Sequence, residues 1–369
     1  MYFYRNLEMN ILFLTFQGDV AGSTYSISYL AKGMADRGHN IYVGCRLESL
    51  LYKMLANTNV NLIPMTFSGR FDLQNIKQIR NAVLQYSIQV VNAQSSYDRY
   101  TSVFAKWIYR LNTKIVHTRR QISKSVGGFF PNLVLVKGTD KVVAVSEGVK
   151  VSLVKTGIPE DHIEVVYNGT PQGKYENVDQ SKTEQLKIKY GIHSGEFVIG
   201  CVSRLKNQEQ IVKALELINF KVKLIFVGID QQPHWEEITK KYHVPHEVYY
   251  TGTVNPEEAL SYYGLFTIKI LASTMEGLSQ SLLEAMALGV PVIATNASGN
   301  SELISHEVNG LLFEDGDIKE LSDYITQLHN DGNLRKKFIK KGKETAFQDF
   351  SIESTVKGFE DLFEQLIKS

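Results

Sequence analysis

The sequence is poor in the features that mark secreted, metal-binding or membrane-spanning proteins. Its two cysteines, Cys45 and Cys201, are far apart, and each lies in or at the end of a predicted strand, so neither a disulfide framework nor a metal cluster is expected. No apolar run reaches the roughly 18 residues that a membrane-spanning helix needs. Residues 1–8 are too few and too polar for a signal peptide. These absences favour a reducing, cytoplasmic location.

Disorder and repetition are scarce as well. The eight prolines are scattered, and the sequence contains neither a low-complexity tract nor an internal repeat. With 369 residues, 43% of them hydrophobic and 11% aromatic, the chain is too long for one ordinary core and rich enough for two. We therefore expect two folded domains.

The net charge of +1 hides an asymmetry between the two halves of the chain. Residues 1–175 hold 20 Lys and Arg against 11 Asp and Glu, whereas the remainder holds 20 against 28. A basic first half suggests an anionic partner, such as a membrane surface or a phosphorylated substrate, although a charge match between domains would give the same pattern. No nucleic-acid partner is expected, because the basic residues form no continuous arm and no nucleic-acid-binding signature accompanies them.

Strand and helix signals alternate through both halves. Apolar runs of strand length in the first half include residues 10–16, 41–45 and 114–117, and helical patterns between them include residues 23–37 and 73–86. The second half repeats this alternation, with strands expected at residues 197–203, 222–227, 248–250, 265–270 and 291–295. Buried apolar strands that alternate with amphipathic helices predict parallel sheets covered on both faces.

The two halves are separated by a stretch that lacks periodicity. Around residues 168–179 the sequence gathers Gly, Pro, Gln and Asn, which is typical of a linker. We expect an N-terminal domain at residues 1–170, a linker at 171–190, a C-terminal domain at 191–350 and a final helix at 351–369. The predicted fold class is α/β, with two doubly wound parallel sheets that bind ligands at the carboxyl ends of their strands.

The most informative stretch carries two carboxylates, Glu276 and Glu284. Ser279 is a good N-cap, the apolar run after it predicts a packed helix, and Gly289 followed by Pro291 ends that helix. Glu284 therefore lies inside an apolar helix, where an unpaired charge would cost several kcal/mol. A ligand rich in hydroxyl groups would supply the hydrogen bonds that such a carboxylate needs.

Backbone groups at the start of the same helix point to a second chemistry. The first free N–H groups, around Leu278 to Gln280, would favour a phosphate. Carboxylates for sugar hydroxyls, together with N–H groups for phosphate, suggest a nucleotide sugar. The two carboxylates taken alone would also suit the acid and base of a hydrolase.

Four motifs in the second half resemble the retaining glycosyltransferases of family 4, which have the GT-B fold of two facing Rossmann-like domains. In order, they are Ser203-Arg204-Leu205-Lys206, Val227-Gly228, Glu276 with Glu284-Ala-Met-Ala-Leu-Gly-Val-Pro-Val-Ile-Ala, and Asn309-Gly310-Leu311-Leu312. The first half resembles the family at residues 30–39, 144–146 and 167–169, so the likeness covers nearly the whole chain. The resemblance also implies that the final helix returns toward the first domain.

The resemblance assigns the donor-binding residues. Arg204 and Lys206 would clamp the donor diphosphate, a task that suits a forked guanidinium and a compact ammonium. Members of the family usually have a longer loop between these two positions than this chain has. Further donor contacts are implied for Glu276 on the sugar, Glu284 on the ribose, Val254 on the base, and the backbone of Gly277, Leu278 and Ser279 near sugar and phosphate.

Two positions of the first half also correspond to the family. Gly22 follows the first strand, where members of the family have paired glycines that let the backbone approach the donor phosphates. In this chain Gly22 would either serve that purpose or merely allow a tight turn. His117, at the end of a strand, matches a position where members often carry a histidine that faces donor sugar and acceptor. A structural histidine is the alternative.

Two segments of the first half place cations beside large aromatic residues. They are residues 106–110 and residues 119–130. This mixture suits a membrane interface or an anionic acceptor, and a solvated helix face above core aromatics would give the same pattern. The expected location is therefore cytoplasmic, with peripheral contact to an anionic membrane as an open alternative.

The resemblance implies a retaining transferase that moves a sugar from a nucleoside diphosphate sugar, most simply a UDP- or GDP-sugar, to a hydroxyl of a glycan or lipid-linked acceptor. Such chemistry belongs to bacterial cell-surface glycan or lipopolysaccharide synthesis. No metal and no further cofactor are expected, since the sequence has no His/Cys cluster. The alternatives are a sugar-nucleotide epimerase and a non-catalytic sugar-nucleotide-binding protein of the same fold.

Overall fold

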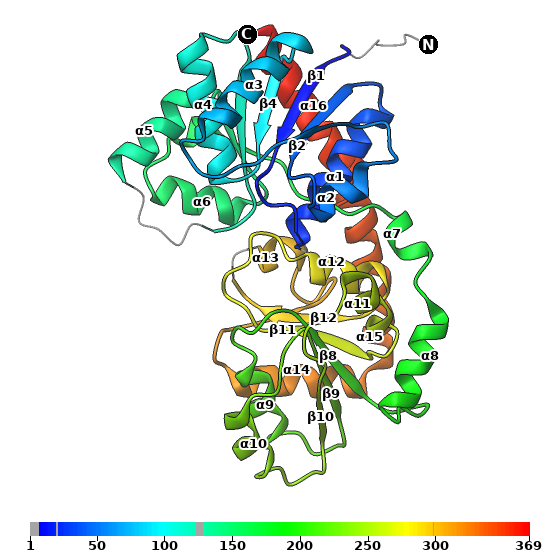
Figure 1. The fold of residues 1–369 in the computed structure, drawn as a ribbon. Helices are drawn as coiled ribbons and strands as arrows, with labels where there is room; N and C mark the ends of the chain where they lie inside the picture. Colours follow the sequence, from blue (N-terminus) through cyan, green and yellow to red (C-terminus); the bar gives the residue numbers. More distant parts are fainter. Residues whose placement is uncertain (1–6, 20, 123–127, 298) are drawn as a thin grey trace, which may run out of the picture. The chain divides into compact units, whose positions relative to one another are not determined.

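The computed structural model describes residues 7–19, 21–122, 128–297 and 299–369, which divide between two compact units. The described residues up to Gly169, together with Ile352–Ser369, form unit 1, and Thr170–Ser351 form unit 2. Each unit has a parallel sheet with helices on both faces, as Figure 1 shows. The expected α/β class is thereby confirmed.

The strands of unit 1 form one parallel sheet in the order β3-β2-β1-β4-β5-β6-β7. Their bounds are β1 (Asn10–Leu14), β2 (Asn40–Cys45), β3 (Asn61–Pro64), β4 (Val90–Ala93), β5 (Lys114–Arg119), β6 (Lys141–Ala144) and β7 (Ile163–Val165). The chain first builds the sheet outward from β1 in one direction and then resumes at β4 on the other side. The gap between β1 and β4 is thus the topological switch point, where sheets of this kind bind ligands.

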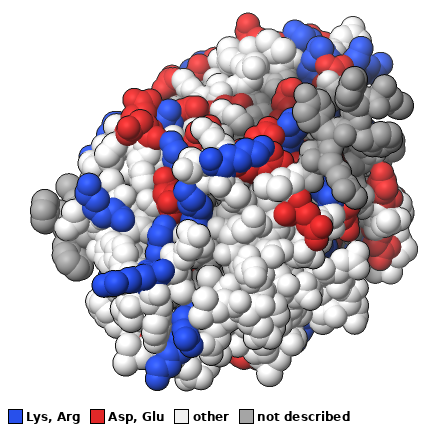
Figure 2. Space-filling model, turned by 90° about the horizontal axis from the view of Figure 1, so that it is seen from above, with Lys and Arg blue, Asp and Glu red and all other residues white. Residues whose placement is uncertain are grey.

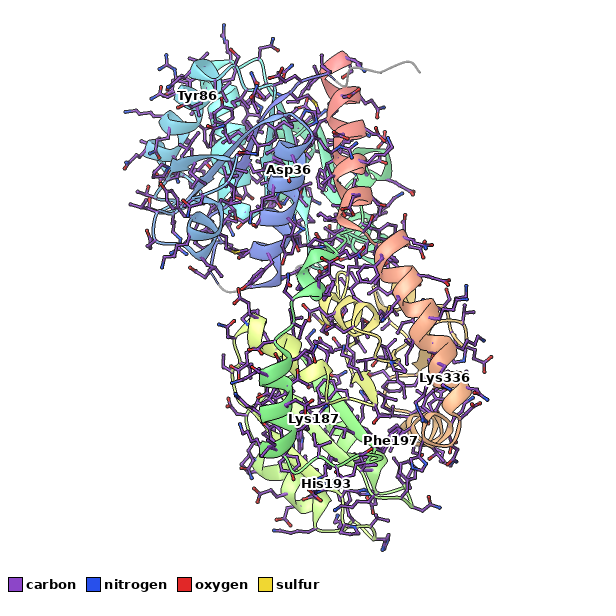
Figure 3. The ribbon with its side chains drawn as sticks, turned by 90° about the vertical axis from the view of Figure 1, so that its right-hand side faces the viewer. Asp36, Tyr86, Lys187, His193, Phe197 and Lys336 are labelled. Carbon is purple, nitrogen blue, oxygen red and sulfur yellow. The ribbon has the colours of Figure 1, made fainter. Side chains whose placement is uncertain are left out.

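The helices of unit 1 are α1 (Gly22–Asp36), α2 (Leu50–Leu55), α3 (Leu73–Gln85), α4 (Ser96–Tyr109), α5 (Phe129–Gly138), α6 (Glu147–Lys155), the 3-10 helix η1 (Glu160–His162) and α16 (Ile352–Lys368). Alternation along β1 distributes the core between two faces of the sheet. Ile11 and Phe13 pack with residues of α1, α2 and α16, whereas Leu12 and Leu14 pack with residues of α3 and α4. Figure 3 shows α16 beside α1, whose last residue, Asp36, is labelled.

The strands of unit 2 repeat this topology in the order β10-β9-β8-β11-β12-β13. Their bounds are β8 (Val198–Val202), β9 (Lys223–Val227), β10 (Glu247–Tyr250), β11 (Ile268–Leu271), β12 (Val292–Thr295) and β13 (Leu311–Phe313). The switch point of this sheet lies between β8 and β11, which pair in register at Ile199 and Ile268. The loops that follow these two strands are therefore the expected ligand-binding loops of unit 2.

The helices of unit 2 are α7 (Gly173–Glu176), α8 (Gln180–Lys189), α9 (Glu209–Leu215), α10 (Pro233–Thr239), α11 (Pro256–Tyr263), α12 (Gln280–Ala287), α13 (Asn300–Leu303), α14 (Ile318–Asn330), α15 (Gly332–Glu344) and the π-helix η2 (Thr345–Asp349). One core of the unit joins β8 and β9 to α9 and α14, and it includes Phe197, which Figure 3 labels, and Trp235. None of the helices that the structure describes is long and apolar enough to cross a bilayer.

The segment at residues 171–190, which the sequence predicted to be a linker, contains α7 and α8 and belongs to unit 2. Asp179 caps α8 by accepting a hydrogen bond from the Lys182 backbone N–H at 3.0 Å. Leu186 and Tyr190 are buried, so the segment has its own packed face. The Gly and Asn residues mark the turns around these short helices and do not form an irregular connection.

Candidate functional site

The loops at the switch point of unit 2 carry three of the expected donor residues. Arg204 and Lys206 follow β8, and Glu276 lies between β11 and α12. The structure brings two of them together, because the Nζ group of Lys206 donates to Oε1 of Glu276. The side chain of Lys206 is 31% exposed and that of Glu276 is 16% exposed, so a ligand can reach both partners.

The short loop after β8 is held in place by Gln208, a residue with no sequence signal. Gln208 is fully buried. Its Nε2 donates to Ser203 Oγ at 2.7 Å and to the Arg204 carbonyl at 2.8 Å, and its Oε1 accepts from the Lys206 N–H at 2.5 Å. Three hydrogen bonds from one buried amide fix the loop backbone, and Lys206 reaches Glu276 although the loop is shorter than the family pattern.

The Arg204 side chain is exposed and pairs with none of the described carboxylates. Gly228, at the end of β9, supports the loop from the neighbouring strand. It has a positive φ of 88°, and a Cβ at this position would lie 2.9 Å from the Ser203 carbonyl oxygen. Only glycine accommodates both conditions, which explains the glycine of the Val227-Gly228 motif.

Ser279 caps α12, as the sequence predicted, by accepting a hydrogen bond from the Leu282 backbone N–H. The loop before the helix passes against Gly299, where an added Cβ would lie 2.1 Å from the Gly277 carbonyl oxygen. Leu278 and Ser279 are buried, whereas Gly277 keeps part of its surface. Gly277 is thus the part of this loop whose backbone a ligand can approach most closely.

Glu284 has two partners that the sequence analysis missed. The Nζ group of Lys174, on α7, lies 2.6 Å from Oε1, and the Tyr263 hydroxyl donates to Oε2 at 2.8 Å. Burial and the nearby carboxylate raise the pKa of Tyr263 well above its usual value, so it remains a donor. The charge inside the apolar helix is therefore satisfied by the protein itself, with the side chain still 18% exposed.

A second lysine lies beneath the same loops. Lys269, in the middle of β11, is fully buried and donates to Ser281 Oγ at 2.9 Å. Burial lowers the pKa of Lys269 to about 8, against the opposing influence of the Cys201 thiol, Glu276 and Glu284. Burial likewise raises the pKa of the Cys201 thiol to about 11. A buried ammonium group thus lies within electrostatic range of both site carboxylates.

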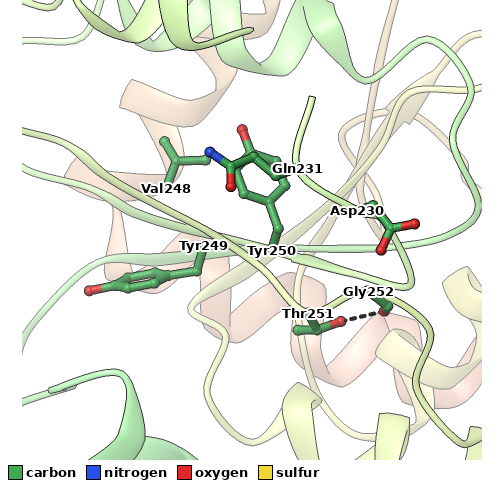
Figure 4. Close-up of a pocket in the computed structure, with 7 residues that line it drawn as sticks. All are labelled: Asp230, Gln231, Val248, Tyr249, Tyr250, Thr251 and Gly252. Carbon is green, nitrogen blue, oxygen red and sulfur yellow. Dashed lines mark hydrogen bonds between the residues drawn. The ribbon is translucent and has the colours of Figure 1, made fainter. Parts of the chain in front are cut away.

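The other end of the sheet contains an open hollow of about 480 Å³. It is lined by Asp230, Gln231 and residues 248–252, and Figure 4 shows Thr251 Oγ1 donating to the Gly252 carbonyl at 2.8 Å. Val254, expected near the nucleotide base, lies two residues beyond Gly252 and is half-buried. Strands β9 and β8 separate this hollow from β11, so it is not the place where Glu276 and Lys206 meet.

In unit 1 a buried carboxylate joins the two loops at the switch point. Asp98 accepts from the Phe16 N–H at 2.8 Å, after β1, and from the Gln94 and Ser95 N–H groups at 2.9 and 2.6 Å, after β4. Burial raises the pKa of Asp98, and these hydrogen bonds oppose that rise. Asp98 therefore fixes the carboxyl ends of β1 and β4 relative to each other.

Gly22 is the first residue of α1 and is exposed. The turn that leads to it includes residue 20, which lies outside the described residues. In this turn a side chain would clash at Gly18, because a Cβ there would lie 2.8 Å from the Cβ of Ser49. The tight approach in this turn is thus made by a glycine that the sequence analysis did not single out.

His117 lies on β5 with no exposed surface. Its Nδ1 is 3.0 Å from the Ala93 carbonyl, which requires a proton on Nδ1, and the buried Nε2 has no partner in the structure. Burial, then the charges of Arg99 and Arg119, lower the pKa of His117 well below its usual value. The ring is therefore neutral, and its unpartnered nitrogen is an acceptor.

The basic and aromatic segment at residues 119–130 is described only in part. Residues 123–127 lie outside the described residues. Arg120 donates to Gln94 Oε1 and, at 2.7 Å, to Asn168 Oδ1, so it belongs to a polar network of unit 1. Burial lowers the pKa of Arg120 to about 10. In the described ranges, no three His, Cys, Asp or Glu side chains converge to hold a metal ion.

Comparisons with known proteins match both units. The family model "Glycosyl transferases group 1" matches residues 182–345, and "Glycosyltransferase Family 4" matches residues 20–172. The N-acetyl-alpha-D-glucosaminyl L-malate synthase of Bacillus anthracis is 26% identical over 375 residues, covering 96% of this chain and 97% of that protein.

Two solved structures show the same fold. A glycosyltransferase from Rickettsia africae superposes with a TM-score of 0.82 at 22% identity, covering 98% of this chain and 99% of that one. HepE from Anabaena, in complex with UDP-glucose, gives a TM-score of 0.79 at 21% identity, with 97% and 100% covered. At these identities the likeness concerns the fold.

Proposed function

Because this chain belongs to the group 1 glycosyltransferases and has their GT-B fold, we propose that it transfers a sugar from a nucleoside diphosphate sugar to an acceptor hydroxyl with retained configuration. One observation carries the proposal: Lys206 and Glu276 meet at the switch point of unit 2, beside the capped start of α12. The complex of HepE with UDP-glucose supports a nucleotide sugar as the donor.

Donor binding would replace the ion pair between Lys206 and Glu276. The diphosphate would take Lys206 and the exposed Arg204, which releases Glu276 to accept hydrogen bonds from the hydroxyls of the sugar. The backbone of Gly277, Leu278 and Ser279 would lie along sugar and phosphate. Gly22 stays a predicted contact of the donor phosphates, as the resemblance implies.

Glu284 is suited to hold the ribose diol. Tyr263 occupies Oε2, and Lys174 occupies Oε1 at 2.6 Å, so a hydroxyl would share the oxygen that faces Lys174. Both partners hold the carboxylate in one orientation, which is what a bidentate contact with two hydroxyls requires. The base would extend toward Val254.

The transfer step breaks the bond between the anomeric carbon and the phosphate oxygen and forms a bond from the anomeric carbon to the acceptor oxygen. The acceptor proton passes to an oxygen of the departing diphosphate on the same face of the sugar. Arg204 and Lys206 would stabilise the charge on the leaving group without a metal ion. His117, neutral and with an acceptor nitrogen, would orient the acceptor hydroxyl from unit 1.

The first test incubates the protein with labelled UDP-, GDP- and ADP-sugars, alone and with lipid extracts. Transfer of label to an acceptor supports the proposal, epimerised donor would support a sugar-nucleotide epimerase, and tight binding without turnover would support a non-catalytic protein. Glu276→Ala should lower transfer by more than about tenfold, or about 1.4 kcal/mol of barrier. Arg204→Ala should weaken nucleoside diphosphate binding in calorimetry, and unchanged binding would refute the clamp.

A surface of unit 1 supports a membrane-associated acceptor. Phe71, 68% exposed, stacks on Phe104 at 5.4 Å, and Trp107, 45% exposed, packs edge-on against Phe104 at 6.0 Å. We call these three residues the aromatic surface. The guanidinium of Arg80, on α3, lies 5.4 Å over the ring of Tyr109, which belongs to α4 as Phe104 and Trp107 do. Exposed aromatics beside cations match the interface of an anionic bilayer.

Charge is unevenly distributed over one face of the protein. On the face shown in Figure 2, acidic side chains lie mainly in the upper and right-hand parts, whereas the lower left part carries Lys and Arg among uncharged side chains. Liposome sedimentation with anionic lipid tests the proposal. Phe71→Ser with Trp107→Ser should reduce binding, and Ile188→Ser, at an 81% exposed site of unit 2, should not. Equal binding by all variants, or none by wild type, would exclude this surface.

A further inference from the structure

Three arginines of unit 1 gather at the carboxyl edge of its sheet. Arg99 lies in the first turn of α4, directly after β4, and Arg119 is the last residue of β5, the neighbouring strand. Arg70 joins them from the loop before α3, because the guanidinium groups of Arg70 and Arg99 lie over the same ring, Tyr100, at 5.4 and 4.8 Å. We call these three residues the arginine cluster.

The cluster lacks a matching negative charge. Among the residues that the structure describes, no carboxylate forms an ion pair with Arg70, Arg99 or Arg119. Asp98 is the nearest acid in sequence, but its two oxygens accept from the Phe16, Gln94 and Ser95 groups, which hold the switch-point loops. Burial lowers the pKa of Arg99, and the hydrogen bond with Tyr100 and the charge of Asp98, which favour the charged form, do not outweigh it. The cluster is thus left without a direct ion pair to the described carboxylates.

The cluster is also short of hydrogen-bond partners. Arg99 is only 8% exposed, and among the described residues its Nε has no hydrogen-bond partner, nor has the buried Nε of Arg119. The buried Nε2 of His117, two residues before Arg119 and on the same face of β5, is unpartnered as well. Burial and mutual repulsion lower the pKa of Arg119, and burial lowers that of Arg99. Buried donors without acceptors are rare in proteins unless a ligand completes them.

We propose that Arg70, Arg99 and Arg119 bind a small dianionic group, a phosphate or a pair of carboxylates, carried by the acceptor of the transferase. This inference rests on the proposed function where it names the acceptor as the molecule that carries the anion. The anion site itself does not depend on that function. The position agrees with the rule that doubly wound sheets bind ligands beyond the carboxyl ends of their strands. Forked guanidinium groups suit the paired oxygens of both anions.

The exposure of the three arginines gives the site an entrance and an interior. Arg70 is exposed, Arg119 is half-buried and Arg99 is buried. An anion would first meet Arg70 and then settle between Arg99 and Arg119, where water screens its charge least. Next to this anion, the neutral acceptor nitrogen of His117 would accept a proton donor of the same molecule, such as its hydroxyl.

The test is calorimetric titration of the full chain with inorganic phosphate and with malonate. Wild type should bind both, and Arg204→Gln, which removes a cation of unit 2, should still bind them. Arg99→Gln and Arg119→Gln should each weaken binding by about tenfold or more, the usual effect of one charge-assisted hydrogen bond. Lys53→Gln, which removes an exposed cation of α2 in the same unit, is the control and should bind as wild type does. Undiminished binding by Arg119→Gln overturns the proposal.

Thermal unfolding separates a binding role from a structural one. Because burial and repulsion from Arg99 disfavour the charge of Arg119, Arg119→Gln should melt at the same or a higher temperature than wild type without anion, and it should lose the rise that phosphate gives wild type. A structural role would instead lower the melting temperature and leave that rise intact. Such a result would refute the anion site.

Two further measurements separate this proposal from the transferase proposal and identify the anion's source. If UDP or GDP binds while phosphate and malonate do not, the anion site is wrong and the donor assignment stands. If phosphate and malonate bind but UDP, GDP and ADP do not, the anion site stands and the donor assignment fails. In a labelled-donor assay, label in lipid phosphates or in water-soluble acids supports the site and names its source, and label in neutral acceptors alone contradicts it.

Discussion

Replacement of Lys269 by methionine should stabilise unit 2 at neutral pH. Burial lowers the pKa of Lys269 from 10.5 to about 8. Since one pH unit corresponds to about 1.4 kcal/mol, the folded state disfavours the charged lysine by about 3 kcal/mol. Loss of the hydrogen bond to Ser281 Oγ removes about 1 kcal/mol of this gain. We expect Lys269→Met to raise the free energy of unfolding by about 2 kcal/mol at pH 7.

The advantage should disappear as the pH rises, and the sign follows from linkage. Below pH 8 both the folded and the unfolded states carry the charged lysine, so the full penalty applies. Between about pH 8 and 10.5 the folded state loses its proton before the unfolded state does, and wild type gains stability. The difference between wild type and Lys269→Met should therefore shift by about 2 kcal/mol in favour of wild type between pH 7 and 10.

Urea unfolding at several pH values, followed by tryptophan fluorescence, measures this difference. Trp235 is buried in the core of unit 2 and reports on that unit, while Trp107 belongs to unit 1. Lys223→Met is the matched control, because Lys223 is equally buried on β9 but pairs with Glu247 at 3.1 Å, so its loss should destabilise the unit at pH 7. A pH-independent difference for Lys269→Met, or destabilisation at pH 7, would refute the reasoning.

Three further predictions concern the polar contacts of unit 2. Lys174→Met should destabilise the unit by about 1 to 3 kcal/mol, since it leaves the partly buried Glu284 without its cation. In a double-mutant cycle measured by urea unfolding, adding Glu284→Gln should recover part of that loss. Gln208→Leu should lower transfer by about tenfold and the free energy of unfolding by about 2 kcal/mol, because three backbone and side-chain groups lose their partner. Transfer within twofold of wild type, or about 0.4 kcal/mol, would exclude a role of Gln208 in positioning the loop after β8. Glu247, whose pKa is lowered to about 2 chiefly by Lys221, Tyr249 and Lys223, should stabilise the fold at pH 7 and lose that effect as pH falls from about 4.5 to 2. Acid unfolding of Glu247→Gln beside wild type measures this, and parallel curves would contradict it.

The sequence was sufficient for the fold and for one side of the candidate site. Alternating apolar strands and helices predicted two doubly wound sheets, and Ser279 signalled the start of α12 because capping is a local property. The family resemblance assigned Glu276 and Lys206 to one donor site, and the structure joins the two side chains. The roles of these residues in donor binding stay predictions.

The partners of Glu284 could not be predicted from local patterns. Lys174 is 110 residues away in the chain and lies in a stretch whose Gly and Asn content resembled a linker. Lys269 looks like an ordinary strand lysine, because a sequence does not show whether a side chain points into a core. Gln208 lies in a polar stretch of sequence that resembles a surface loop. In each case the contact depends on packing between elements distant in sequence.

In the proposed donor site, the ion pair between Lys206 and Glu276 would favour whole donors over their parts. A free diphosphate that captures Lys206 leaves Glu276 without its counter-charge, and a free sugar that engages Glu276 leaves Lys206 without its own. Only a molecule with both an anion and hydroxyls at the right separation compensates both residues at once. The proposed donor site would thus bind tightly only a molecule that has both groups. Hydrolysed nucleotide sugars would compete poorly with intact ones.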